Sequence, residues 1–198
     1  MLVQSKPSLR RLALDRRAVQ ENKDELSRQI VERLVALPEF AAARAVLIYL
    51  DVRSEVRTRH ALPDLLLQDK RIVVPWCEND RLRLFHLQAA CELDRGAFAI
   101  LEPRGDLRER PERIVEPAEL DLIVVPGVAF DRRGGRLGHG MGYFDRLLAE
   151  ARPDATLVGL AFECQLFDQV PLEAHDVRLD FIITESGIYR GQGRQPRI

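Results

Sequence analysis

Five short, continuously apolar segments constrain this chain more than any other feature of its sequence. Stretches with helical spacing or with turn residues separate them, and they lie at 45–50, 71–75, 120–126, 156–161 and 180–184. A strand that is apolar along its whole length is buried on both faces, which is typical of a parallel sheet covered by helices. The alternation therefore predicts an α/β protein, a three-layer sandwich around a mainly parallel sheet.

The remaining segments fit between these strands. Helices are expected at 8–37, 57–68 and 143–151, and residues 81–87 alternate like a strand with one exposed face. Within the first helical stretch, Asn22 followed by Glu25 predicts a capping box for a second segment, which Pro38 ends. The mixed-charge stretch 88–117 is expected to be connecting structure.

Length and charge narrow the class of protein. A chain of 198 residues can bury a core without disulfides or a metal, so a single domain is expected over 1–198. In it, the helical segment 8–37 packs on the α/β core and 191–198 forms a frayed tail. The formal net charge of −1 argues against a nucleic-acid or anionic-membrane binder. Without a membrane-length apolar run, and with three cysteines read as reduced, buried thiols, we expect a cytoplasmic protein, and a monomer since nothing demands a partner.

The segment from Gly127 to Asp145 carries the chemical signal. It lies between a buried strand and a helix and contains glycines at 134, 135, 138, 140 and 142. Such a loop exposes backbone N–H groups at a helix N-terminus, where an anion such as phosphate is favoured, and Arg136 adds a charged donor. The alternative is a glycine-rich connection that only turns the chain.

Two common phosphate-binding motifs are excluded. A Walker A loop needs a glycine followed by lysine, which does not occur in this segment. A dinucleotide-binding loop needs a third glycine where Tyr143 stands. The loop is therefore of neither common type.

Pro126–Asp131 together with Arg136–Asp145 closely resembles the signature of the 5-formyltetrahydrofolate cyclo-ligase (5,10-methenyltetrahydrofolate synthetase) family. Further matching pieces occur in family order over nearly the whole chain: Lys6 with Arg10, Tyr49-Leu50 with Glu55 and Thr58, Val170-Pro171 with Asp176, and Leu179-Asp180. Met141 and Phe144 depart from the pattern, since many relatives carry lysine or glycine at the first position and tyrosine at the second.

The resemblance implies a reaction and an architecture. The family uses ATP and Mg²⁺ to convert 5-formyltetrahydrofolate to 5,10-methenyltetrahydrofolate, releasing ADP and phosphate. Its fold resembles the sugar-phosphate isomerase and CoA-transferase group. Two other readings stay open: a nucleotide- or folate-binding module that has lost catalysis, and a sugar-phosphate isomerase-like enzyme of the same fold.

The resemblance also implies residue roles. Arg136 and Tyr143 would be catalytic, and Asp145 with Asp176 would hold Mg²⁺. ATP would contact Lys6, Arg10, Arg136, Leu137, Gly138, His139, Gly140, Met141, Gly142, Tyr143 and Phe144. The folate would contact Leu50, Glu55, His139, Gly140, Met141, Gly142 and Tyr143. Trp76 is read either as core or as a surface on which a ligand stacks, and is not counted in the site.

Overall fold

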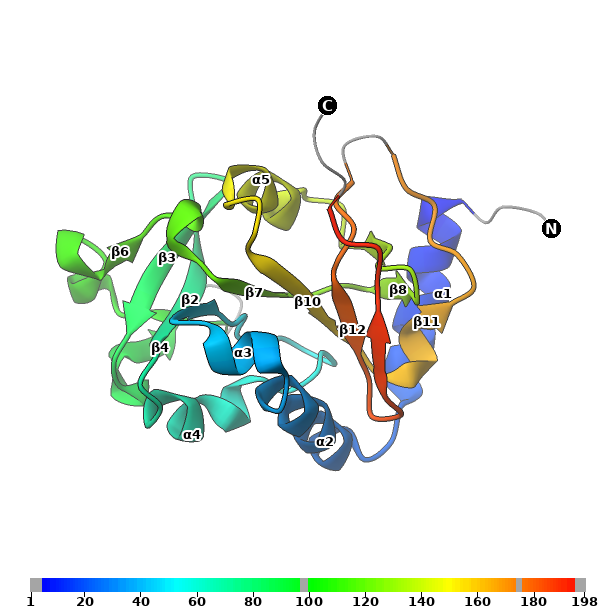
Figure 1. The fold of residues 1–198 in the computed structure, drawn as a ribbon, viewed down its shortest axis with the longest axis horizontal. Helices are drawn as coiled ribbons and strands as arrows, with labels where there is room; N and C mark the ends of the chain where they lie inside the picture. Colours follow the sequence, from blue (N-terminus) through cyan, green and yellow to red (C-terminus); the bar gives the residue numbers. More distant parts are fainter. Residues whose placement is uncertain (1–4, 97–99, 174–175, 195–198) are drawn as a thin grey trace.

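The computed structural model describes residues 5–96, 100–173 and 176–194 of the chain. Its main element is an eight-stranded sheet in the order β13-β12-β10-β7-β1-β2-β3-β6 (Figure 1). These strands are β1 (Ala45–Leu47), β2 (Arg71–Glu78), β3 (Arg81–Leu87), β6 (Ile114–Val115), β7 (Leu122–Val125), β10 (Thr156–Leu160), β12 (Phe181–Ile183) and β13 (Ile188–Arg190).

The centre of this sheet is parallel and its edges are antiparallel. β12, β10, β7, β1 and β2 pair in parallel, while β3, β6 and β13 join in antiparallel orientation. The register aligns Ala45 with Arg71 and Leu47 with Ile123. The predicted mainly parallel sheet is thus confirmed, and the parallel strands are the continuously apolar segments of the sequence.

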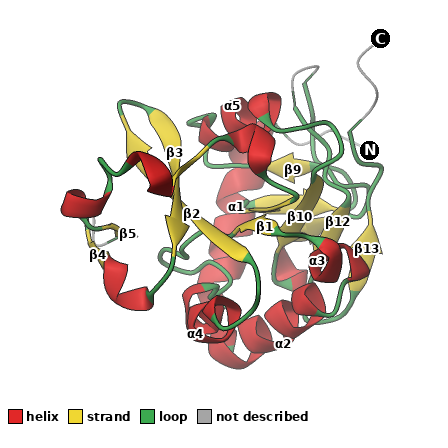
Figure 2. Ribbon diagram, turned by 60° about the vertical axis from the view of Figure 1, so that its left-hand side comes forward, coloured by secondary structure: helices red, strands yellow, loops and turns green. Residues whose placement is uncertain are grey.

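Helices cover both faces of the sheet (Figure 2). On one face α2 (Lys23–Val35), α3 (Pro38–Ala42) and α4 (Leu62–Leu66) bury Ile30, Phe40 and Leu65 against the sheet. On the other face α5 (Tyr143–Glu150) buries Leu147 and Leu148. Successive strand residues alternate between these two cores, which gives the three layers that the sequence predicts.

The N-terminal helix packs elsewhere. α1 (Lys6–Val19) buries Leu9 and Ala13 against a second, three-stranded sheet made of β8 (Ala129–Asp131), β9 (Arg136–Leu137) and β11 (Leu166–Phe167). In Figure 1 this helix stands beside β8 and β11 at the end of the main sheet. The segment expected as 8–37 is therefore two helices with different partners.

The stretch expected as connecting structure, 88–117, contains short regular elements in its described parts, 88–96 and 100–117. It contains a two-stranded ribbon of β4 (Leu93–Arg95) and β5 (Leu101–Pro103), the edge strand β6, and short 3₁₀ turns at Ala90–Glu92, Gly105–Leu107 and Pro111–Arg113. Further 3₁₀ turns span Arg59–Ala61, Pro117–Glu119 and Glu163–Gln165. Buried Arg113 organises this region by donating to the His86 carbonyl and to Glu92.

Several local predictions were wrong. Asn22 adopts a left-handed conformation and makes no capping hydrogen bond through its side chain, while Glu25 pairs with Arg28 instead. Pro38 begins α3 besides ending the preceding segment. The helix expected at 57–68 is only a 3₁₀ turn followed by the five residues of α4.

Two other expectations fail at the surface. Residues 191–194 are tied down by backbone hydrogen bonds from Gly191 to Asp180 and from Gln192 to Arg133, so this part of the tail is not frayed. The remaining tail residues, 195–198, lie outside the described structure. Cys77 and Cys91 are exposed rather than buried.

Among the described residues, no helix is long and apolar enough to cross a membrane.

Candidate active site

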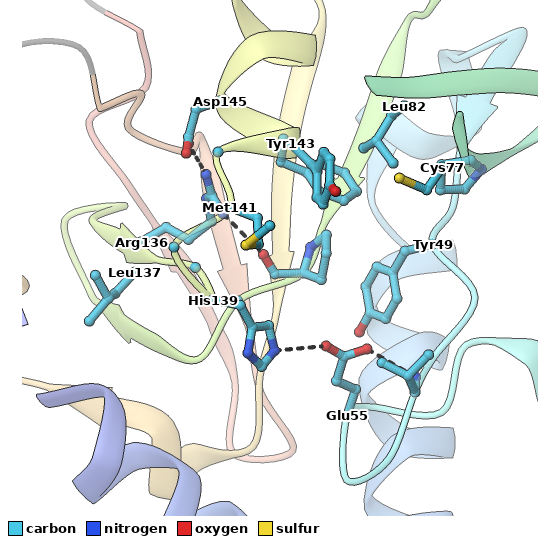
Figure 3. A pocket seen from close by; sticks show the side chains of 18 of the residues that line it. Tyr49, Glu55, Cys77, Leu82, Arg136, Leu137, His139, Met141, Tyr143 and Asp145 are labelled. Carbon is cyan, nitrogen blue, oxygen red and sulfur yellow. Dashed lines mark hydrogen bonds and ion pairs between the residues drawn. The ribbon is translucent and has the colours of Figure 1, made fainter. Parts of the chain in front are cut away.

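A cavity of about 560 Å³ opens at the carboxyl ends of the central strands (Figure 3). Residues that end or follow β1, β2 and β7 line it, including Leu50, Trp76 and Gly127. This is the edge where open α/β sheets bind ligands, because successive loops converge there. The cavity is the frame in which each predicted residue can be placed.

The glycine-rich segment forms one wall of this cavity. β8 and β9 pair as an antiparallel hairpin, and residues 138–142 then lead into α5. Gly140 (φ 100°) and Gly142 (φ 66°) take left-handed conformations that a side chain would disfavour. α5 has no side-chain cap at its N-terminus within the described chain, so its first N–H groups are available to an anion.

Arg136 is the buried cation of this wall. Its guanidinium pairs with Asp145 and lies 3.4 Å from the Pro126 carbonyl. Its Nε is buried and has no hydrogen-bond partner among the described residues. Burial lowers the pKa of Arg136, and the nearby carboxylates of Asp145 and Asp176 act in the opposite direction. An arginine remains charged at physiological pH even so, which leaves a buried donor beside the glycine-rich loop.

α1 brings two more cations to the same wall. The Lys6 ammonium lies 2.8 Å from Asp176 and 2.9 Å from Glu173, and one turn later Arg10 donates through Nε to the Gly138 carbonyl at 2.8 Å. Although burial acts to lower it, the hydrogen bonds to Asp176 and Glu173 raise the pKa of Lys6. Both residues line the cavity, as the family resemblance implied.

Glu55 lies beside His139 at the cavity. Its carboxylate is buried, accepts a hydrogen bond from the Val52 N–H at 3.0 Å, and comes within 3.7 Å of the imidazole Nε2 of His139 (Figure 3). Beside it, the Tyr49 hydroxyl donates to the Val56 carbonyl, and burial raises the pKa of Tyr49 well above its usual value. Thr58, which also matched the family pattern, is buried and donates to the Tyr49 carbonyl, so its role is to hold this loop.

The opposite wall is largely apolar. Leu50, which the resemblance placed in the folate pocket, is joined there by Tyr49, Leu82, Ile100, Leu101 and Trp76. Trp76 is only 2% exposed and packs edge-to-face on Phe85, with ring centroids 6.5 Å apart. Trp76 is therefore a core residue, as one of the two interpretations predicted, and it also lines the cavity.

Three of the predicted site residues, Tyr143, Leu137 and Met141, lie away from the centre of the glycine-loop wall. Tyr143 lies toward Cys77 and Asp80 rather than beside Arg136, and its hydroxyl is 3.5 Å from the Asp80 carboxylate. A hydrogen bond with Cys77 and the charges of Cys77 and Asp80 raise the pKa of Tyr143. Leu137 is buried in the core between α1 and β8, whereas Met141 is 63% exposed at the cavity rim.

The carboxylates predicted as metal ligands are both at the cavity. Asp145 pairs with Arg136, and Asp176 pairs with Lys6 and accepts the Glu173 N–H. No cluster of three ligand-type side chains occurs in the described ranges. Two carboxylates are nevertheless the donor set that Mg²⁺ takes when phosphate oxygens and water supply the remaining positions. The donors therefore fit Mg²⁺ delivered with a phosphate ligand.

Other residues of the cavity carry no signal in the sequence that would assign them to a site. Ile100 and Leu101 belong to a segment read as a connection, and Leu82 to a strand beyond the parallel core. Cys77 lies two residues after the strand predicted at 71–75, and its place at the carboxyl edge of the sheet is the one clue that could have found it. Trp76 offered the same clue.

Comparison with known proteins agrees with this geometry. The sequence profile of the 5-formyltetrahydrofolate cyclo-ligase family matches residues 3–185. The chain belongs to that family. A 5-formyltetrahydrofolate cyclo-ligase from Escherichia coli is 30% identical over 173 residues, covering 85% of this chain and 93% of the relative. One from Saccharomyces cerevisiae is 32% identical over 182 residues, covering 80% of this chain and 82% of the relative.

Solved structures give the same relationship. The NMR structure of Aquifex aeolicus 5,10-methenyltetrahydrofolate synthetase superposes with a TM-score of 0.82 at 34% identity, covering 98% of this chain and 96% of that one. The synthetase from Mycoplasma pneumoniae, at 24% identity and a TM-score of 0.72, covers 92% and 99% and supports the fold. The protein is thus an enzyme of the cyclo-ligase family, with a ligase activity in folate metabolism.

Proposed function

We propose that this enzyme uses ATP and Mg²⁺ to cyclise 5-formyltetrahydrofolate to 5,10-methenyltetrahydrofolate, with release of ADP and phosphate. The observation that carries the proposal is the two-sided cavity. One wall presents Lys6, Arg136 and the glycine loop, which suit phosphates, and the other is apolar and ends at Glu55, which suits a flat heterocycle. A single cavity with both walls would hold a phosphoryl donor next to a pterin.

The chemistry has two steps. First, the formyl oxygen attacks the γ-phosphorus of ATP, a new O–P bond forms, and ADP leaves with the electrons of the broken bond. Next, N10 attacks the formyl carbon, the C–O bond to phosphate breaks, and the N10 proton is lost to water or the departing phosphate. Phosphoryl transfer depends on positioning and on neutralising charge, so the protein needs no covalent intermediate.

The residues divide this work between them. Arg136 and the N–H groups of 138–143 would receive phosphate charge, and Lys6 would exchange its contact with Asp176 for a phosphate oxygen. Arg10 holds the loop itself through Gly138 and lies against Gly140, so we assign it to the shape of the loop as well as to phosphate. Asp145 and Asp176 would hold Mg²⁺, which supplies charge neutralisation on the phosphates when bound.

The folate side rests on fewer groups. Glu55 would accept hydrogen bonds from ring N–H groups of the pterin, while Leu50 and the edge of Trp76 contact its faces. Tyr143 and Phe144 would contact the pterin ring on the side of the cavity near the β2–β3 hairpin. The exposed Met141 takes the place of a phosphate-binding cation, so its contribution is limited to contact. Cytoplasmic localisation and a monomeric state stay predictions from the sequence.

The test is a spectrophotometric assay of the purified enzyme with 5-formyltetrahydrofolate and MgATP, following the absorbance of methenyl-folate. We expect product only when ATP and a divalent cation are both present, and none with EDTA. The 10-formyl isomer serves as the control substrate. A folded protein that binds ATP but forms no product would contradict the proposal and favour the binding-module reading.

A further inference from the structure

A buried arginine on α1, Arg17, lies behind the cavity and is not among the residues that line it. It is 2% exposed, although it carries a full charge. Burying an arginine is unfavourable unless its donors are paired, so a fully buried one needs a structural reason. Its contacts supply that reason.

Arg17 joins the two segments that face each other across the site. Its Nε donates to the Ser54 hydroxyl at 3.0 Å, and its Nη1 donates to the Gly127 carbonyl at 3.2 Å. Ser54 directly precedes Glu55, whereas Gly127 follows β7 after Pro126 and begins the glycine-rich segment. One rigid guanidinium therefore sets the spacing between these segments.

The Gly127 side of this link is firmly held. Its carbonyl also accepts from Gln165 at 3.2 Å, and Gln165 is itself buried and donates to the Val128 carbonyl at 2.9 Å. A Cβ on Gly127 would lie 2.4 Å from the Phe130 ring, so the backbone is pressed against the core. Because Gly127 cannot shift easily, its hydrogen bond fixes the Arg17 guanidinium, which in turn holds Ser54 in place.

The Glu55 side is where the link has its effect. Burial lowers the pKa of Arg17, and the charge of Glu55 is the largest influence in the opposite direction. The two groups make no direct ion pair in the described structure, so the Glu55 oxygens remain directed to Val52 and His139. A buried positive charge thus acts on Glu55 without pairing directly with its oxygens.

We infer that Arg17 is a positioning residue for the folate site, which holds Glu55 at its working distance from the glycine loop and balances its charge. The inference rests on the proposed role of Glu55 in binding the folate. Lysine cannot replace it fully, because one ammonium on a flexible stem does not reproduce a planar fork that spans two acceptors.

The experiment compares Arg17→Gln, Arg17→Lys and Ser54→Ala with Arg11→Gln, a control on an exposed face of the same helix. For Arg17→Gln we expect the KM for 5-formyltetrahydrofolate to rise about tenfold, since small displacements of a positioned group are costly. The KM for ATP and kcat should change less than about threefold, by the same reasoning, because Lys6 and Arg10 still hold the phosphate wall. Arg17→Lys should have a folate KM between those of Arg17→Gln and the wild type. Ser54→Ala should raise the folate KM by a smaller factor, and it tests the same link if Arg17→Gln does not fold.

A double-mutant cycle separates positioning from a general loss of stability. If Arg17 acts through Glu55, the KM of Glu55→Gln should rise less than about twofold further when Arg17→Gln is added. Independent, multiplied effects would overturn the inference, as would a folate KM for Arg17→Gln and Ser54→Ala equal to that of Arg11→Gln.

Hydrogen exchange in the free enzyme provides a readout that does not depend on turnover. We expect faster exchange in peptides covering 51–58 for Arg17→Gln and Ser54→Ala, with no change for Arg11→Gln. Unchanged exchange there would overturn the inference. Absence of turnover in the wild-type enzyme would instead contradict the proposed function, and exchange alone would then decide on Arg17.

Discussion

The two ends of the parallel sheet use the same kinds of charged residue for different purposes. At the amino ends, Asp121 accepts the N–H groups of Arg44 and Ala45 and pairs with Arg152, while Asp180 accepts the Leu157 N–H. At the carboxyl ends, Asp145 pairs with Arg136 beside an open cavity, and a buried Arg136 nitrogen has no partner among the described residues.

The difference separates charged groups that complete the fold from charged groups that lie beside an open cavity. Carboxylates at the amino end complete backbone hydrogen bonds that the strands cannot make among themselves. At the carboxyl end the pairs are exposed to a cavity and can exchange partners. Substitutions at the amino end of the sheet should therefore change stability, and substitutions at the carboxyl end should change activity.

The largest expected effect is at Arg136. Arg136→Gln should lower kcat/KM about a thousandfold, since a buried arginine that neutralises transferring phosphate is worth roughly that much in related chemistry. The assay of methenyl-folate formation measures this, and a thermal melt verifies folding. Arg133→Gln, an exposed neighbour, is the matched control and should retain activity within about twofold, as surface substitutions usually do. Equal activities for the two variants would remove Arg136 from the site.

Asp145→Asn should have the next largest effect. Losing one carboxylate weakens both the Arg136 pair and the hold on Mg²⁺, so turnover should fall about ten- to a hundredfold and half-saturation should need more Mg²⁺. A Mg²⁺ titration of initial rates measures both. Glu150→Gln, at the exposed end of the same helix, serves as control. An unchanged Mg²⁺ dependence would contradict the assignment of Asp145 as a ligand.

Asp121→Ala tests the amino end. It leaves the N–H groups of Arg44 and Ala45 without their acceptor, which should lower the free energy of unfolding by about 1–3 kcal/mol. Turnover per folded molecule should stay within about twofold, because this carboxylate lies at the far end of the strands from the cavity. Urea unfolding and the assay together decide. Loss of activity without loss of stability would break the comparison between the two ends.

The smallest effect is expected at Asp180. Burial raises the pKa of Asp180, with the Leu157 hydrogen bond and nearby arginines acting the other way. A carboxyl with a raised pKa keeps its proton longer in the folded state, so stability falls as pH rises from the unfolded value to the raised one. Asp180→Asn keeps an oxygen for Leu157 and carries no charge to bury. It should match or slightly exceed the wild-type melting temperature at pH 7.

The pH dependence provides the check on Asp180. The gap between Asp180→Asn and wild type should shrink as the pH falls below about 4, where the wild-type carboxyl is protonated in both states. A marked destabilisation at pH 7 would mean that the charge itself stabilises this end of the sheet.

The local sequence predicted the buried framework well and the irregular elements poorly. The apolar runs at 45–50, 120–126 and 156–161 became β1, β7 and β10, because a strand buried on both faces leaves an unmistakable pattern. The two-residue strands β9 and β11 were missed, because so short a segment has no period to detect. The capping box at Asn22 failed because a left-handed turn was needed to redirect the chain between α1 and α2.

The candidate site divides in the same way. The sequence by itself determined the three-layer α/β class, the glycine loop ahead of α5, and the residues that place the chain in the cyclo-ligase family. Those features are local: they depend on spacing within about twenty residues, on apolar runs and on glycines that a helix N-terminus needs.

Only the tertiary structure decided which distant groups face one another. It brought Glu55 to His139, made Trp76 and Leu101 parts of one wall, turned Tyr143 toward Cys77, and placed Arg17 between Ser54 and Gly127. Contacts of this kind join residues tens of positions apart in the chain. They follow from how helices and strands pack, and no local pattern in the sequence encodes them.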